Sequence, residues 1–303
     1  MLNIKETQST NKIDIVGILK ELELEEKTTT DGQEIVVGKA TIKVDQEISG
    51  QLAECEIPVE MYATKLTKEG KESKLYPIVL GYKKLTSLAA CPEDQPQLAS
   101  KVTVTGATLS ENVWFDTKSN QARSSYKIRS NFLNSYNGSM EDFKPTAKFE
   151  LSGVILETAP ELNKEGTETG RLKVTMAVVN YGGKIDIIPL IAESPSAVNF
   201  INANWNQGDT VKVAGRVKIS HRVDRWEEAQ GFGDPIVREK TVSCREFIIT
   251  SGSEAGMDED HSYDADDIKA GLQERKTRIE QSKTRAPKGR TQTPQTGGNK
   301  YDW

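Results

Sequence analysis

The chain has 303 residues, of which 36% are hydrophobic and 28% are charged, and its net charge at pH 7 is −5. No apolar run approaches the roughly 18 residues that a membrane-spanning helix needs, and residues 1–17 lack the apolar core and cleavage site of a signal peptide. The composition therefore excludes a membrane-spanning helix and predicts a cytoplasmic protein with enough length for two domains.

Residues 12–252 fall into two units with the same order of predicted elements. The first unit begins with a run in which apolar residues recur at every second position around Gly17. A turn at Asp31 and Gly32 leads into the next run, and a stretch at residues 82–90 is expected to be helical. Alternating β-branched runs between turn residues are typical of half-buried strands. The predicted strands of this unit are residues 12–26, 34–45, 53–63, 101–115 and 122–134.

The second unit repeats the order of three strands, a short helix and two strands. Ser194 and Pro195 fit the N-cap and the first position of a helix over residues 194–205. The predicted strand segments are residues 147–162, 170–192 (with a turn at Asn-Tyr-Gly-Gly), 206–226 and 241–252.

Glycines within four of the predicted strands indicate bulges or sharp coiling, where a small barrel bends. They are Gly17, Gly106, Gly153 and Gly215. The sequence thus predicts an all-β protein with two tandem five-stranded Greek-key barrels of the OB type. The predicted boundaries are residues 1–140 for the first barrel with its inserts, 145–252 for the second, and 253–303 for a flexible tail.

The predicted tail is acidic over residues 254–267 and basic over residues 269–300. Its composition favours disorder. One segment, residues 264–283, places Ile268, Leu272 and Ile279 on one side of a helix. Since that helix is too short and polar to be stable alone, we expect it to fold on a partner or on its own barrel.

Four segments of the second unit carry a family resemblance. LSGVILETAPEL (151–162) joins a glycine-containing apolar strand to a Pro-Glu-Leu turn, and LKVTMAVVN (172–180) is an apolar strand. SAVNFINANWNQGD (196–209) ends a helix in a Gln-Gly turn, and VKVAGRVKI (211–219) surrounds Gly-Arg with apolar residues. In order and spacing these segments resemble the bacterial-type single-stranded DNA-binding protein family. The duplicated barrel looks more like a phage or mobile-element version, which would work in the host cytoplasm.

Single-stranded nucleic acid is held by aromatic rings that stack on bases and by cations that follow the phosphates. The sequence offers such residues where the fourth strand of each unit enters its outer hairpin. In the first unit they are Trp114, Phe115, Arg123, Tyr126, Lys127 and Arg129. In the second unit they are Arg216, Lys218, His221, Arg222, Arg225 and Trp226. The resemblance adds Tyr181, in the turn where the family often places a base-stacking loop.

Several of these residues have a structural alternative. Trp205, at the end of the predicted helix, is expected in the core, and Trp114 and Trp226 could be packing residues. In the resembled family an acidic tail that ends in an aromatic residue docks replication and repair proteins. Tyr301, Asp302 and Trp303 fit that role in part, because a basic linker separates them from the acidic block, and an ordinary disordered end is the alternative.

No nucleotide-binding loop, nucleophile elbow or HExxH motif is present in the sequence. Cys55, Cys91 and Cys244 are widely spaced and two histidines cannot build a histidine-rich site, so we expect no metal, cofactor or catalysis. The predicted function is sequence-independent binding of single-stranded DNA during phage DNA replication or recombination, with replication or recombination proteins as partners and a possible homo-oligomer. The alternatives are an interaction or virion scaffold built from OB barrels, which the acidic charge favours, and an inhibitor of a host enzyme.

Overall fold

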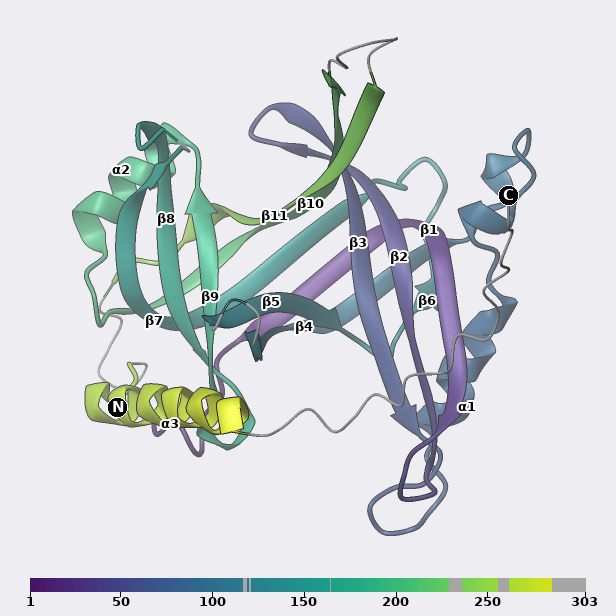
Figure 1. Cartoon of the computed structure of the whole chain (residues 1–303), viewed down its shortest axis with the longest axis horizontal. Helices are drawn as coiled ribbons and strands as arrows, with labels where there is room; N and C mark the ends of the chain where they lie inside the picture. The colour runs from purple at the N-terminus through teal and green to yellow at the C-terminus, as the bar shows by residue number, and fades with distance from the viewer. Residues whose placement is uncertain (117–118, 120, 164, 229–235, 256–261, 285–303) are drawn as a thin grey trace, which may run out of the picture.

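The computed structural model describes residues 1–116, 119, 121–163, 165–228, 236–255 and 262–284. Most of this part of the chain is strand, and Figure 1 shows the strands gathered into two neighbouring barrels. The structure confirms the predicted all-β class.

The first barrel contains β1 (Asn11–Thr28), β2 (Glu34–Ile48), β3 (Gln51–Thr64), β4 (Lys101–Asp116) and β5 (Gln121–Arg129). β1 pairs antiparallel with both β2 and β4, β2 pairs antiparallel with β3, and β5 lies parallel to β3 and antiparallel to β4. The hydrogen-bonded order 1-2-3-5-4 therefore closes on itself, as a five-stranded Greek-key OB barrel requires.

The connection between β3 and β4 holds α1 (Leu75–Gly81), followed by the 3₁₀ turns η1 (Tyr82–Lys84), η2 (Leu88–Ala90) and η3 (Pro96–Leu98). The stretch expected to be helical, residues 82–90, forms the two 3₁₀ turns η1 and η2, and the regular helix α1 precedes it. Tyr76 and Val79 turn its apolar side toward the barrel. Pro77 obscures the helical pattern of α1 in the sequence, because proline usually breaks a helix. It is tolerated in this first turn, whose N–H groups have no helical acceptor.

The second barrel contains β7 (Thr146–Leu162), β8 (Glu168–Val179), β9 (Ile185–Ala192), β10 (Thr210–Glu228) and β11 (Ile236–Gly252). Its pairings repeat the closed order, with β11 parallel to β9 and β10 paired to β7. The turn η4 (Tyr181–Gly183) joins β8 to β9, and α2 (Pro195–Asn204) joins β9 to β10. The Ser194 side chain accepts a hydrogen bond from the Ala197 N–H at 3.2 Å, which confirms the predicted N-cap.

Strand alternation decides which side chains fill the barrel interiors. The glycine at position 215 shows why a bend was predicted there. A Cβ atom on Gly215 would lie 1.9 Å from the Ile248 carbonyl oxygen and against the Phe149 ring. The β10–β11 register shifts between Ala214 and Gly215. A bulge at this position lets the strand coil closely over the core, as the sequence predicted.

The two barrels share a continuous edge and a buried polar contact. β1 pairs antiparallel with β7 from Asn11↔Leu151 to Val16↔Thr146. At the turn end of β2, Gln46 is only 4% exposed. Its side-chain nitrogen donates to the Val217 carbonyl at 2.7 Å, and its oxygen accepts from the Ala147 N–H at 2.9 Å. One side chain of the first barrel thus satisfies two backbone groups of the second.

Replacing Gln46 with methionine should lower the free energy of unfolding by about 1–3 kcal/mol, because a similar volume remains while the buried Ala147 N–H loses its acceptor. Urea denaturation followed by circular dichroism measures this. Gln51→Met, at the exposed first residue of β3, is the matched control and should change stability by less than about 0.5 kcal/mol. Equal stability of the two variants would show that the Gln46 contact contributes nothing.

The C-terminal helix α3 (Ala265–Thr284) lies beneath the second barrel in Figure 1 and packs on this chain's own barrels. Ile268 and Leu272 join an apolar cluster with Ile185 of β9 and Ile4. Arg275 reaches β4 of the first barrel and donates to both carboxylate oxygens of Glu111, at 3.0 and 2.6 Å. The helix was predicted to fold on a partner or on its own barrel, and the structure shows it packed on the chain's own barrels.

Three further observations concern residues singled out in the sequence. Trp205 is 4% exposed and its indole N–H donates to the Ser253 carbonyl at 2.9 Å, which confirms its predicted place in the core. Cys55 is buried, Cys91 and Cys244 are half-buried, and all three thiols are free. No helix among the described residues is long and apolar enough to cross a membrane.

Candidate nucleic-acid interface

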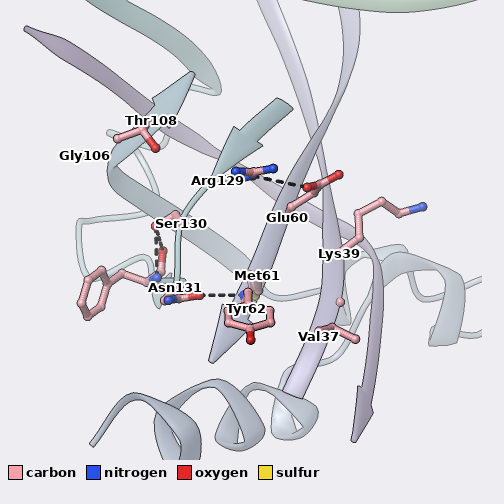
Figure 2. A pocket seen from close by; sticks show the side chains of 12 residues that line it. Val37, Lys39, Glu60, Met61, Tyr62, Gly106, Thr108, Arg129, Ser130 and Asn131 are labelled. Atoms are coloured by element: carbon pink, nitrogen blue, oxygen red, sulfur yellow. Dashed lines mark hydrogen bonds and ion pairs between the residues drawn. The ribbon is translucent and has the colours of Figure 1, made fainter. Parts of the chain in front are cut away.

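A groove with a volume of about 770 Å³ lies on the first barrel between the β2–β3 face and the segment after β5. Two aromatic rings border it, Tyr62 at the end of β3 and Phe132 just beyond β5, which are 52% and 49% exposed. Lys39 of β2 and Arg129 of β5 add positive charge, and Figure 2 shows the Glu60 carboxylate turned toward Arg129. The groove therefore combines exposed rings with cations.

The segment that carries Phe132 is firmly held. The Tyr62 N–H donates to the Asn131 side-chain oxygen at 2.9 Å, which Figure 2 marks as a dashed line. The Tyr82 hydroxyl donates to the Asn131 carbonyl at 2.9 Å and accepts from the Leu133 N–H at 3.0 Å. Since Leu133 is buried in the core, its neighbour Phe132 is presented outward on a fixed loop.

Strand alternation extends this groove along the β4–β5 hairpin. Residues 123, 125, 127 and 129 of β5 point to one side, and the register places Trp114 opposite Arg123 and Thr108 opposite Arg129. Trp114 is 41% exposed. We define the barrel 1 strip as the surface formed by Tyr62, Phe132, Lys39, Arg129, Lys127, Arg123 and Trp114. Four of these residues, Trp114, Arg123, Lys127 and Arg129, were predicted from the sequence.

Each cation of the barrel 1 strip has a carboxylate partner. The ion pairs are Lys39–Glu23 at 3.2 Å, Lys127–Glu60 at 2.6 Å, Arg129–Glu60 at 3.6 Å and Arg123–Asp116 at 2.8 Å. These side chains are between 22% and 57% exposed, and ion pairs at the surface contribute only about 0–1 kcal/mol. A phosphate could therefore replace these carboxylates at small cost.

Two aromatic residues of the first unit lie elsewhere than expected. Tyr126 was predicted to stack on bases, but its ring packs edge-on against Phe247 with the centroids 6.2 Å apart, and burial raises the pKa of its hydroxyl. We therefore place Tyr126 in the packing between the barrels. Phe115 lies opposite Ala122, on the other side of the hairpin from Trp114.

The predicted residues of the second unit divide between the two sides of β10, with Arg216, Lys218 and Trp226 on one side by strand alternation. By the β10–β11 register, His221 and Arg225 share one side of the hairpin and Trp226, which is 48% exposed, lies on the other. Arg222 pairs with Val242 in the ladder, but its side chain lies outside the described residues.

The predicted cations and the histidine of the second unit contact residues of their own barrel. Arg216 donates to the Thr146 hydroxyl, Lys218 pairs with Glu246 at 3.3 Å, His221 Nδ1 lies 2.9 Å from the Ser243 hydroxyl, and Arg225 pairs with Glu239 at 2.7 Å. Burial alone would raise the pKa of Glu246, but Arg171 and Lys218 outweigh it and hold that pKa below its ordinary value. Lys218 therefore serves a charged network with Glu246 and Arg171 of the second barrel.

Tyr181 belongs to the second barrel and does not line the groove on the first. Its ring is 82% exposed in the turn between β8 and β9, and neighbouring Gly183 lies beside Ile4 and Lys5 of the N-terminal segment. The predicted docking residues Tyr301, Asp302 and Trp303 lie outside the described residues.

The sequence reasoning missed three members of the barrel 1 strip, namely Tyr62, Phe132 and Lys39. Alternation could have found Tyr62, because Met61 and Ala63 on either side are core residues in the structure. Phe132 gave no periodic signal, since it lies in the loop that follows β5.

A protein-family model matches most of this chain. The YorF family model matches residues 9–285, which includes both barrels and α3. The chain belongs to the YorF family. No curated protein matches this YorF-family chain.

Two solved structures are similar in shape to this YorF-family chain. Wild-type single-stranded DNA binding protein from Thermus aquaticus is 14% identical, with a TM-score of 0.49 over 82% of this chain and 94% of that one. A deletion variant of the Thermus aquaticus protein is also 14% identical, with a TM-score of 0.48 over 83% of this chain and 97% of that one. The barrel assignment rests on the strand order described above.

Proposed function

We propose that this chain binds single-stranded DNA without sequence preference, on the barrel 1 strip, and does so without catalysis. One observation carries the proposal. Two exposed rings, Tyr62 and Phe132, share a surface with a line of cations that ends at Trp114. Each base that stacks on a ring contributes about 1–3 kcal/mol, whatever the base, because every base has a π-face. The finer assignment to phage DNA replication or recombination follows from the sequence resemblance.

The lack of sequence preference follows from what the groove offers to a base. Ring faces and flexible cations carry little sequence information, whereas base reading needs hydrogen-bonding groups aimed at base edges. The Asn131 side-chain oxygen, an obvious candidate for base reading, already accepts from the Tyr62 backbone. The groove is therefore suited to stacking and phosphate contact.

Fluorescence anisotropy with a labelled oligo-dT of about 25 nucleotides, beside a duplex of the same length, tests this function. If each of the four cations of the barrel 1 strip contacts one phosphate, the slope of log affinity against log salt concentration is about −3. Affinity for oligo-dT should then fall about 50-fold between roughly 50 and 200 mM salt, and the duplex should bind more weakly. No binding of oligo-dT at the lower salt would refute the function and favour an OB barrel that docks proteins.

A further inference from the structure

We infer that the groove between the two barrels is a second phosphate site, in which Arg245 of the second barrel binds the same DNA strand that occupies the barrel 1 strip. This inference rests on the proposed function and extends it to both barrels. The groove has a volume of about 250 Å³ and is lined from the first barrel by Lys39, Glu60 and Lys127 and from the second by Ile219, Arg245 and Phe247.

The junction groove continues the groove on the first barrel. Lys39 and Glu60 line both, so a strand that passes over them from Tyr62 reaches the junction without leaving the surface. On the far side, the β10–β11 register places His221 and Ser243 just beyond Ile219 and Arg245 on the same side of the hairpin. The strand therefore has a continuous path from one barrel to the other.

Arg245 has the chemistry that a phosphate oxygen needs. Its guanidinium donates to the Tyr126 carbonyl across the junction, which fixes its position. A guanidinium carries five N–H donors in a fork that matches phosphate geometry, so one fixed bond leaves others for a ligand. Burial lowers the pKa of Arg245, and Glu60 is the carboxylate whose charge it feels.

The charge balance of the junction favours an anion. Among the described residues, no carboxylate forms an ion pair with Arg245, because Glu60 pairs with Lys127 and Arg129 and Glu23 pairs with Lys39. The residues that line the junction groove thus carry three cations, Lys39, Lys127 and Arg245, and one carboxylate, Glu60, in a chain whose overall charge is negative. The exposed Arg245 side chain is accessible to a phosphate that enters this groove.

The test compares Arg245→Gln, which removes the charge but keeps a donor for the Tyr126 carbonyl, with Arg245→Lys, which keeps the charge. Lys84→Gln, on an exposed 3₁₀ turn outside both grooves, changes the net charge by the same amount and is the control. Anisotropy titrations use oligo-dT of about 30 nucleotides, long enough to reach both barrels, at three salt concentrations. Thermal unfolding checks the fold of each variant.

Arg245→Gln should weaken binding about 10- to 100-fold, the effect of one charge-assisted hydrogen bond. Its salt slope should become shallower by about 0.7. Arg245→Lys should stay within about 5-fold of the natural protein, and Lys84→Gln within about 2-fold.

An Arg245→Gln variant that binds like Lys84→Gln overturns the junction site. If Tyr62→Ala weakens binding in the same series, the interface on the first barrel stands and only this inference fails. Should Arg245→Gln fold poorly, Lys127→Gln provides the second test, and an unchanged salt slope in that variant also overturns the site.

Discussion

Replacing Arg275 with alanine is expected to lower the free energy of unfolding by about 3–5 kcal/mol, the cost of removing one partner from a buried ion pair. The Glu111 side chain is only 3% exposed and that of Arg275 is 19% exposed. Without the guanidinium, a carboxylate beneath α3 is left with the Ile187 N–H, 3.1 Å away, as its remaining donor. Desolvation of that uncompensated charge is the source of the loss.

The change at Arg275 has two possible readouts, because α3 can detach before the barrels unfold. Urea denaturation measures the global effect, and amide hydrogen exchange of residues 265–281 measures detachment of the helix. Lys276→Ala removes an exposed cation one residue away and should cost less than about 0.5 kcal/mol. If Arg275→Ala matches Lys276→Ala in both measurements, the Arg275–Glu111 pair does not hold the helix.

The double variant Tyr62→Ala/Phe132→Ala is expected to lose about 2–6 kcal/mol of binding free energy for oligo-dT, since each stacked base contributes about 1–3 kcal/mol. That loss corresponds to about 30-fold to 10⁴-fold in Kd. Both rings are about half exposed, so the fold should keep its stability to within about 1 kcal/mol. Anisotropy titration measures the Kd, and circular dichroism the stability.

Tyr181→Ala is the matched control for the two groove rings. Its ring is more exposed than either of them, but it lies in the β8–β9 turn of the second barrel and does not line the groove. We expect a change in Kd of less than about 2-fold. A larger loss from Tyr181→Ala than from the double variant would move the interface to the second barrel and contradict the assignment of the strip.

Local pattern was enough to predict the barrels. Alternation and turn residues predicted the strands, Gly215 the bulge, and Ser194 with Pro195 the start of α2. The β4–β5 hairpin was also predictable, because Trp114 and Arg123 are close in sequence and antiparallel pairing brings them opposite each other. These features depend on residues that are near each other along the chain.

The groove itself depends on contacts between distant residues. Phe132 joins Tyr62 only because β5 pairs parallel with β3 and Asn131 holds the loop. Likewise, Arg275 meets Glu111 across 164 positions. The packing of Tyr126 depends on such a contact too, since its neighbour Phe247 belongs to the other barrel. Such contacts leave no periodic signal in a single sequence.

Photocrosslinking tests the central claim most directly. An oligo-dT with 5-iododeoxyuridine at successive positions is irradiated in complex with the full chain, and the adducts are mapped by mass spectrometry. Adducts on Tyr62, Phe132 and Trp114, in an order that follows the oligonucleotide, are the predicted result. Adducts confined to other surfaces, or none from a saturated complex, would contradict the barrel 1 strip as the site of DNA binding.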